Sequence, residues 1–190
     1  MSTGKFEVFE YDDTQNHSVN VDDSVLGKGT VAIRKIMDEK RSPMVNVCMN
    51  LTSDFNKAAV IRAHNAFLGG EVYIVGKRRF DRRGTVGTHH YSTIKHSPDL
   101  KPVIDHLHEL NYTVYAVDNT PAFNPQSCYQ TLFPEKSAFV YGEESRGLDQ
   151  ASVDLCDRTV YIPQPSPVPR SLNVSQAAAV LMSEYNRNRR

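Results

Sequence analysis

The chain of 190 residues is predicted to fold as an α/β protein, with a mostly parallel sheet covered by helices on both faces. Short apolar segments alternate along the chain with longer segments of helical periodicity. The apolar segments have no polar face, which is typical of strands that are buried on both sides of a parallel sheet. Hydrophobic residues make up 39% of the chain, enough to form a real core.

Residues 1–43 are interpreted as an N-terminal arm followed by one helix, and residues 44–190 as the main domain. Residues 1–24 carry six acidic residues and one lysine, and we expect an extended arm or a short strand followed by a loop. One helix is expected between Val25 and Arg41, starting from Thr30.

Strands and helices are expected to alternate from Met44 onward. Ser53 or Asp54 begins a helix that runs to about Leu68, where the pair Gly69-Gly70 is suited to end it. The basic segment that continues to about Thr93 is interpreted as a loop. Strands are predicted at 44–51, 72–76, 112–118, 137–142 and 158–163, further helices at 100–107 and 150–156, and a loop with one helical turn at 119–136.

A long apolar helix is predicted over residues 171–186. Prolines at positions 165, 167 and 169 precede it, so the chain arrives extended, and Ser171 is a natural N-cap. The apolar stripe is wider than a one-sided surface helix needs, so we expect a helix that is covered on more than one side, a width that also suits a dimer interface. The stripe consists of Val174, Ala177, Ala178, Leu181, Met182 and Tyr185, widened by Ala179 and Val180.

Composition argues against several classes of protein. The formal net charge is zero, so no overall field attracts nucleic acid. Three distant cysteines form neither a disulfide framework nor a metal motif, and His89-His90 has no further ligand at suitable spacing, so no metal site is predicted. No signal peptide or long apolar span is visible, and a cytoplasmic protein without a membrane partner is expected.

The most suggestive turn for a ligand lies late in the chain. No glycine-rich dinucleotide or phosphate loop follows the first strand. The sequence GEESRGL at 142–148 instead follows an apolar strand, and its first glycine lets a ligand approach the backbone. Ligands bind at the carboxyl ends of the strands in open α/β sheets. Taken alone, the segment is equally consistent with an ordinary strand-to-helix turn.

Three late segments resemble the closing motifs of the SpoU/TrmH branch of the SPOUT RNA methyltransferases: FVYGEESRGL (139–148), VYIPQ (160–164) and RSLNVSQAAAVLMSEY (170–185). The family pattern is G-x-E-x-x-G-L after a strand, a strand that ends in I-P, and S-L-N-V-S before an alanine-rich helix. Asn56 and Arg62 match its first motif, an Asn six residues before an Arg on a helix. The chain departs from the pattern in two places, since it lacks a glycine soon after I-P and has Ala58 where the family often has glycine.

The resemblance covers about residues 44–188 and implies a fold and an activity. The C-terminal segment would form a deep trefoil knot that holds S-adenosylmethionine, and the protein would be a homodimer. The implied reaction is methyl transfer to an RNA ribose 2′-hydroxyl, in which positioning is a major source of acceleration. The resemblance is greatest to members that act on tRNA. The alternatives are an rRNA-directed enzyme, a catalytically weak RNA-binding protein that kept the fold, and an unrelated nucleotide-binding protein.

The same resemblance assigns roles to individual residues. Arg62 acts at the hydroxyl; because a guanidinium is a poor proton acceptor, we expect it to stabilise the developing alkoxide or to bind a phosphate. Glu144 is expected to accept hydrogen bonds from backbone amides or to orient Arg62. The proposed catalytic residues are Arg62, Asn56, Glu144, Ser171 and Asn173. The proposed cofactor-binding residues are Gly142, Glu143, Ile162, Gln164, Ser171, Leu172 and Asn173.

A basic run is the predicted contact with the RNA backbone, although an ordinary solvated charged surface is the alternative. It comprises Lys77, Arg78, Arg79, Arg82 and Arg83. Because the net charge is zero, affinity for RNA has to come from such a local patch. The acidic arm is a candidate to cover this patch when RNA is absent.

Overall fold

A computed structural model describes residues 6–9, 25, 27–168, 170–187 and 189. In this part of the chain one sheet has the strand order β1-β4-β3-β2-β7-β5-β8-β6. Every neighbouring pair is parallel except β1 and β4. The predicted α/β class with a mostly parallel sheet is therefore confirmed.

The element bounds follow the predicted alternation closely. The strands are β1 (Glu7–Val8), β2 (Val45–Met49), β3 (Glu71–Val75), β4 (Thr93–Ser97), β5 (Thr113–Val117), β6 (Gln126–Ser127), β7 (Ser137–Tyr141) and β8 (Arg158–Tyr161). The helices are α1 (Thr30–Asp38), α2 (Asp54–Ala66), α3 (Arg82–Thr85), α4 (Leu100–Glu109), α5 (Gln150–Asp154) and α6 (Val174–Arg187), with 3-10 turns at Thr88–His90, Pro121–Phe123 and Cys128–Gln130.

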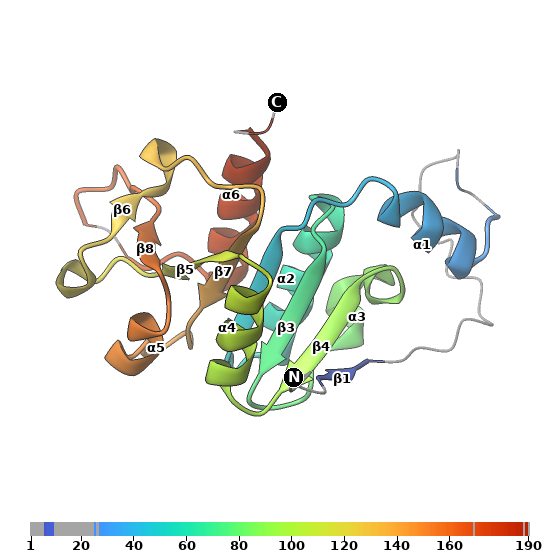
Figure 1. Cartoon of the computed structure of the whole chain (residues 1–190), viewed down its shortest axis with the longest axis horizontal. Coiled ribbons are helices and arrows are strands. Elements are labelled where there is room, and N and C mark those ends of the chain that lie inside the picture. Colours follow the sequence, from blue (N-terminus) through green and yellow to red (C-terminus); the bar gives the residue numbers. More distant parts are fainter. Residues whose placement is uncertain (1–5, 10–24, 26, 169, 188, 190) are drawn as a thin grey trace.

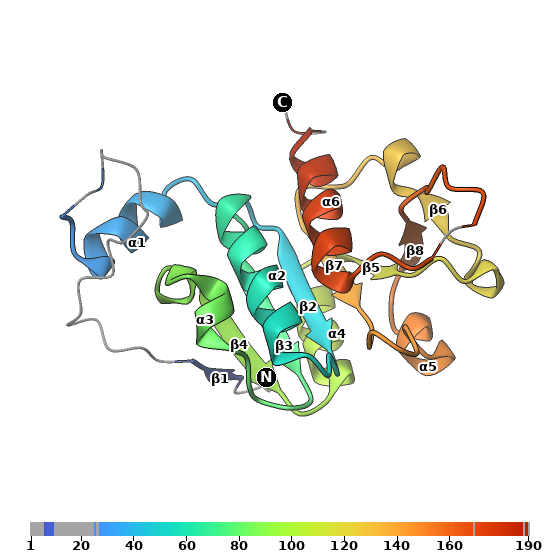
Figure 2. The same cartoon turned by 180° about the vertical axis from the view of Figure 1, so that it is seen from behind.

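Helices cover the sheet on both faces. Helices α2 and α6 lie side by side over one face, with α3 next to α2, and α4 lies over the other (Figures 1 and 2). The central strands β2, β3, β5 and β7 contribute to both cores: Val45 and Val47 of β2 pack on the α4 side, and Cys48 packs on the side of α2 and α6. This double burial is why the strands read as continuous apolar segments.

The loop predicted before residue 93 is only partly correct. Its second half contains α3, which Asp81 caps by accepting from the Arg83 amide at 3.0 Å, and a 3-10 turn. Strand β4 follows, and sequence reasoning missed it because Ile94 is the only apolar residue in TIKHS. Its polar Lys95 is satisfied by Glu71 of β3, at 2.6 Å between Nζ and Oε1.

The N-terminal end of α2 is as predicted, and its C-terminal end differs from the prediction. Ser53 is the N-cap, and its hydroxyl accepts from the Asn56 amide at 3.2 Å. The left-handed residue at the other end is Leu68, with φ 52°, rather than a glycine. Gly69 is needed for space, since a Cβ there would lie 2.2 Å from the His64 ring.

Helix α6 begins three residues later than the expected cap. Asn173 rather than Ser171 precedes it, and the Asn173 carbonyl accepts from the Ala177 amide at 2.9 Å. The stripe residues Ala178, Leu181, Met182 and Tyr185 are buried within the single chain, while Ala179 and Val180 stay partly exposed. Packing within the single chain therefore explains most of the width of the stripe, without a dimer interface.

The N-terminal arm is described only in part. Residues 7–8 form β1, in agreement with a short strand, and the remainder of the expected loop lies outside the described residues. None of the helices in the described ranges has the length and apolar character needed to cross a bilayer.

Candidate active site

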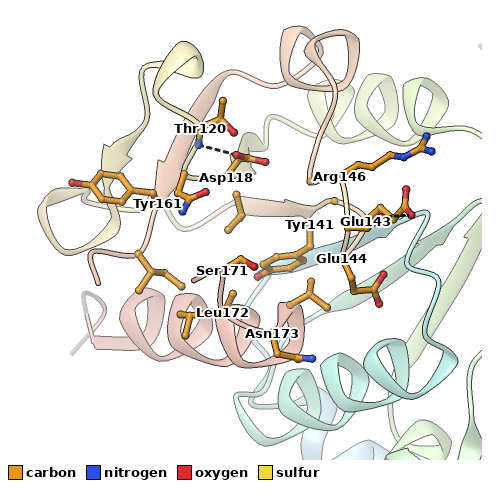
Figure 3. Close-up of a pocket in the computed structure, with 18 of the residues that line it drawn as sticks. Asp118, Thr120, Tyr141, Glu143, Glu144, Arg146, Tyr161, Ser171, Leu172 and Asn173 are labelled. Carbon is orange, nitrogen blue, oxygen red and sulfur yellow. Dashed lines mark hydrogen bonds between the residues drawn. The ribbon is translucent and has the colours of Figure 1, made fainter. Parts of the chain in front are cut away.

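A pocket of about 520 Å³ lies at the carboxyl ends of β5, β7 and β8. Asp118 and Thr120 reach it from the segment after β5, and Tyr161 from the end of β8 (Figure 3). The turn after β7 and the segment before α6 complete its wall. Its volume is in the range typical of sites for nucleotide-sized molecules. Its position agrees with the rule that ligands bind at the carboxyl edge of open α/β sheets.

The residues predicted to hold the cofactor all line this pocket: Gly142, Glu143, Ile162, Gln164, Ser171, Leu172 and Asn173. They come from three segments that are separated along the chain. The fold thus brings the three late motifs to one place, as Figure 3 shows for Glu143, Ser171 and Leu172.

Glu144 joins this pocket to the segment after β2 and to α2. One carboxylate oxygen accepts from the Thr52 amide and hydroxyl, both at 2.9 Å. The other accepts from the Ser53 amide at 3.2 Å and from Asn56 Nδ2 at 2.8 Å. Of the two roles expected for Glu144, binding backbone amides is the one present in the geometry, and no contact with Arg62 occurs among the described residues.

Asn56 extends the network to the start of α6. Its side-chain oxygen accepts from Asn173 Nδ2 at 3.1 Å. The Asn173 oxygen in turn accepts from the Ser175 amide at 2.9 Å, so Asn173 caps α6. Asn56, Glu144 and Asn173, which come from the first and two of the late motifs, therefore form one hydrogen-bonded chain.

The electrostatics of Glu144 suit an anchor rather than a base. Partial burial raises its pKa, but hydrogen bonds from Asn56 and Thr52 outweigh burial and bring the pKa to about 2. The carboxylate is therefore ionised at neutral pH and already accepts four hydrogen bonds. A group in this state holds three segments together and is poorly placed to accept a proton from a substrate.

The turn after β7 is shaped by two glycines. A Cβ on Gly142 would lie 2.3 Å from the Gly147 carbonyl carbon, so only glycine permits this backbone crossing. Gly147 has φ 69°, a conformation that glycine adopts readily. The glycine-bearing turn predicted from sequence is thus a site of close backbone approach at the pocket.

Asp118 is a pocket residue that sequence reasoning missed. Its Oδ1 accepts from the Thr120 amide at 2.9 Å and its Oδ2 from the Leu148 amide at 3.2 Å, so it ties the end of β5 to the turn after β7. The available signal was its position as the first residue after the apolar strand β5, at the carboxyl edge where ligands bind.

Arg62 is not among the residues that line the pocket. It is exposed on α2, and its guanidinium makes no hydrogen bond or ion pair within the part of the chain that the structure describes. Six residues of helix separate it from Asn56 by about 9 Å along the axis and about 120° in rotation. The structure therefore leaves Arg62 available to a ligand but does not bring it to the cofactor pocket.

The basic run lies at the carboxyl end of β3 and on α3, at the same edge of the sheet as the pocket, and its five cations are exposed. Three of its arginines have carboxylate partners: Arg78 pairs with Glu7 at 3.0 Å, Arg79 with Asp54 at 2.8 Å, and Arg83 with Asp81 at 2.8 Å. The positive charge of the run is therefore partly neutralised by these carboxylates. His89 and His90, which follow it, are buried.

The fold, the pocket and the converging motifs are those of an RNA methylase, and the comparisons with known proteins agree. Residues 43–183 match the sequence model of the SpoU rRNA Methylase family, and the chain belongs to that family. A relative from Thermus thermophilus, named tRNA (guanosine(18)-2′-O)-methyltransferase, is 29% identical over 168 residues, which cover 84% of each chain.

Solved structures share the fold. The TrmH/SpoU tRNA modifying enzyme of A. aeolicus superposes with a TM-score of 0.75 at 19% identity, covering 84% of this chain and 82% of the other. The SpoU methyltransferase AviRb from Streptomyces viridochromogenes, in complex with AdoMet, gives 0.67 at 22% identity, covering 78% and 59%.

The residues of the pocket fit S-adenosylmethionine. The pocket volume of about 520 Å³ suits a nucleotide-sized molecule, and the acidic Asp118, Glu143 and Glu144 in its lining complement a positively charged sulfonium. When bound, the cofactor supplies an electrophilic methyl group.

Proposed function

We propose that this protein methylates a ribose 2′-hydroxyl of tRNA with S-adenosylmethionine as donor. The observation that carries the proposal is the hydrogen-bonded chain of Glu144, Asn56 and Asn173, because it fixes α2 of the first motif against the pocket formed by the late motifs. The Thermus thermophilus relative, which acts on tRNA by name, supports tRNA over rRNA.

In this proposal each element of the site has a distinct role. Ser171, Leu172 and the turn at Gly142 hold the donor, and Glu144 keeps the site assembled. Arg62, exposed on α2, meets the RNA from outside the pocket, where it stabilises the alkoxide that develops at the ribose 2′-oxygen or binds the adjacent phosphate. The exposed arginines after β3 hold the RNA backbone.

The proposal also covers the larger organisation of the protein. We infer that the C-terminal segment passes through a loop of the chain and so forms the deep trefoil knot of the SPOUT fold. Residues 44–190 are inferred to form the methyltransferase domain, which follows an N-terminal arm and helix. The enzyme is inferred to be a homodimer. A cytoplasmic location stays a prediction.

Transfer of labelled methyl groups tests the activity. The protein is incubated with labelled S-adenosylmethionine and separately with unmodified tRNA or rRNA, and alkaline hydrolysis is used to locate the label, because a 2′-O-methyl group blocks cleavage at that ribose. We expect an alkali-resistant labelled dinucleotide from tRNA. Label on a base, or only on rRNA, would overturn the corresponding part of the proposal.

Arg62→Ala should reduce transfer by about 100-fold or more, in line with the loss of one group that stabilises a developing oxyanion. Binding of S-adenosylhomocysteine should be unchanged, because Arg62 does not line the pocket. Arg62→Lys should also be poor, since lysine lacks the planar fork. Arg158→Ala, at the amino end of β8 and exposed, is the matched control and should keep full activity.

A further inference from the structure

Phe55 leaves a large apolar ring in solvent at the first turn of α2. Its side chain is 60% exposed, whereas the neighbouring Ala58 and Ile61 of the same helix are fully buried. A single exposed apolar residue needs no explanation by itself. This ring, however, lies between the basic run and the pocket, and that position indicates a role in binding.

The residues on either side of Phe55 face two different sites. Asp54 pairs with Arg79 of the basic run, at 2.8 Å between Oδ2 and Nε. Asn56 bonds to Glu144 and Asn173 at the pocket. The sheet order agrees, since β2, which leads into α2, lies between β3 with the basic run and β7 with the pocket turn. An RNA that spans from the basic run to the pocket therefore has to cross the first turn of α2.

The ring is seated against α3, which lies beside α2 (Figure 2). A Cβ on Gly84 of α3 would lie 3.2 Å from Cδ2 and Cε2 of Phe55, so the glycine provides the flat surface against which the ring rests. Arg82 and Arg83 precede Gly84 in the same short helix and are exposed. An exposed aromatic ring that packs against a short helix carrying two exposed arginines has the composition of a platform for nucleic-acid bases.

We propose that Phe55 stacks on an unpaired nucleobase of the RNA substrate, next to the nucleotide whose ribose enters the site. This inference rests on the proposed function. Aromatic stacking accepts any base because every base has a π-face, so the contact fixes the path of the strand and not its sequence. Phe55 is thus a binding residue for a nucleobase and complements the phosphate contacts of the basic run.

The chain contains no tryptophan, so Phe55→Trp introduces a unique fluorescent probe at this position. Titration with unmodified tRNA, and with single-stranded oligonucleotides, should quench its emission as the base stacks. Tyr129→Trp is the matched control, because Tyr129 is 51% exposed on the 3-10 turn that follows β6, the strand farthest from the basic run in the sheet order. Its emission should remain unchanged.

Affinity measurements separate stacking from packing. Phe55→Ala should weaken binding of tRNA by about 5- to 150-fold, the range expected for one stacked base. Phe55→Leu, which keeps apolar bulk but has no π-face, should be similarly weak, while Phe55→Tyr should bind like the parent. Binding of S-adenosylhomocysteine should be the same in all variants.

The outcomes distinguish this inference from the proposed function. Methylation of tRNA together with unchanged affinity of Phe55→Ala, or with unquenched emission of Phe55→Trp, would overturn the stacking contact and leave the proposed function standing. Equal affinity of the leucine and tyrosine variants would show that only apolar bulk matters and would also overturn it. A protein that neither binds nor methylates RNA would remove the proposed function and the inference with it.

Discussion

Glu144 is the residue on which most of the site's internal hydrogen bonds converge. Glu144→Gln should lower the free energy of unfolding by about 1.5–3 kcal/mol, the contribution of hydrogen bonds to a charged group, and should also weaken donor binding. Glu143→Gln is the control for stability alone, because the Glu143 side chain accepts from the exposed Ser145 hydroxyl in the same turn, at 2.9 Å. Urea unfolding at pH 7 compares the free energies of unfolding of the two variants, and equal values would contradict the anchoring role.

The pH dependence of this effect has a definite sign. The folded-state pKa of Glu144 is about 2, below the ordinary value of 4.5. The stabilisation is therefore complete above about pH 4.5 and is lost as the pH falls toward about 2. The difference in unfolding free energy between the parent and Glu144→Gln should narrow over that window.

Gly142 tests the shape of the pocket at the same scale. Gly142→Ala would place a methyl group 2.3 Å from a backbone atom, a clash that no side-chain movement relieves. We expect binding of S-adenosylhomocysteine to weaken by about tenfold or more, equivalent to about 1.4 kcal/mol. Gly29→Ala is the matched control, since a Cβ there would meet nothing within 4 Å. Equal affinities of the parent and Gly142→Ala in calorimetry would show that the donor does not bind at this turn.

The basic run is proposed to bind the RNA backbone as one element. Neutralising Arg78, Arg79, Arg82 and Arg83 together should weaken RNA binding and flatten its salt dependence, because each phosphate contact contributes about −0.7 to −0.9 to the slope of log K against log salt. The change in slope should be smaller than the value for four phosphate contacts, because three of these arginines already have carboxylate partners.

Filter binding across a salt series measures the slope. Neutralising Lys136 and Arg158, which lie at the amino ends of β7 and β8, is the control and should leave it unchanged. Identical slopes for the parent and the quadruple variant would place the RNA elsewhere, most simply along the C-terminal arginines.

The elements also show which features a sequence can predict. The strands with two apolar faces and the helices with clear periodicity, such as α4, were predicted because burial imposes those patterns. Strand β4 was missed because its polar residues are satisfied by partners distant in sequence, as Lys95 is by Glu71. The cap of α6 was assigned to Ser171 rather than Asn173 because a local pattern cannot decide between two polar residues that both suit the position.

For the site, motif similarity predicted which residues line the pocket but not how they are connected. The bond between Asn56 and Asn173 links positions 117 residues apart, and no local pattern encodes it. Asp118 was missed for a related reason, since a single carboxylate after a strand resembles any loop residue until the turn at Gly147 is placed against it. The ion pairs of the basic run likewise depend on which acidic residues the fold brings near.

At the scale of the whole molecule, the homodimer can be tested without disturbing the core. Leu181 and Met182 of α6 are fully buried within one chain, so an aspartate at either position should unfold the protein and would not report on pairing. Leu132 is the better probe, because it is 83% exposed in the segment after the 3-10 turn that packs against α6. An apolar side chain this exposed, next to a helix expected to pair, is suited to an interface core.

Sedimentation of the unmodified chain at micromolar concentration should therefore give a dimer. Leu132→Asp should give a folded monomer with an unchanged circular dichroism spectrum, because an exposed substitution away from the core costs little stability. Val31→Asp, at a position 64% exposed on α1 at the opposite end of the molecule, is the matched control and should remain dimeric (Figure 1). A monomeric parent protein would contradict the homodimer, and a dimeric Leu132→Asp would place its interface on another surface.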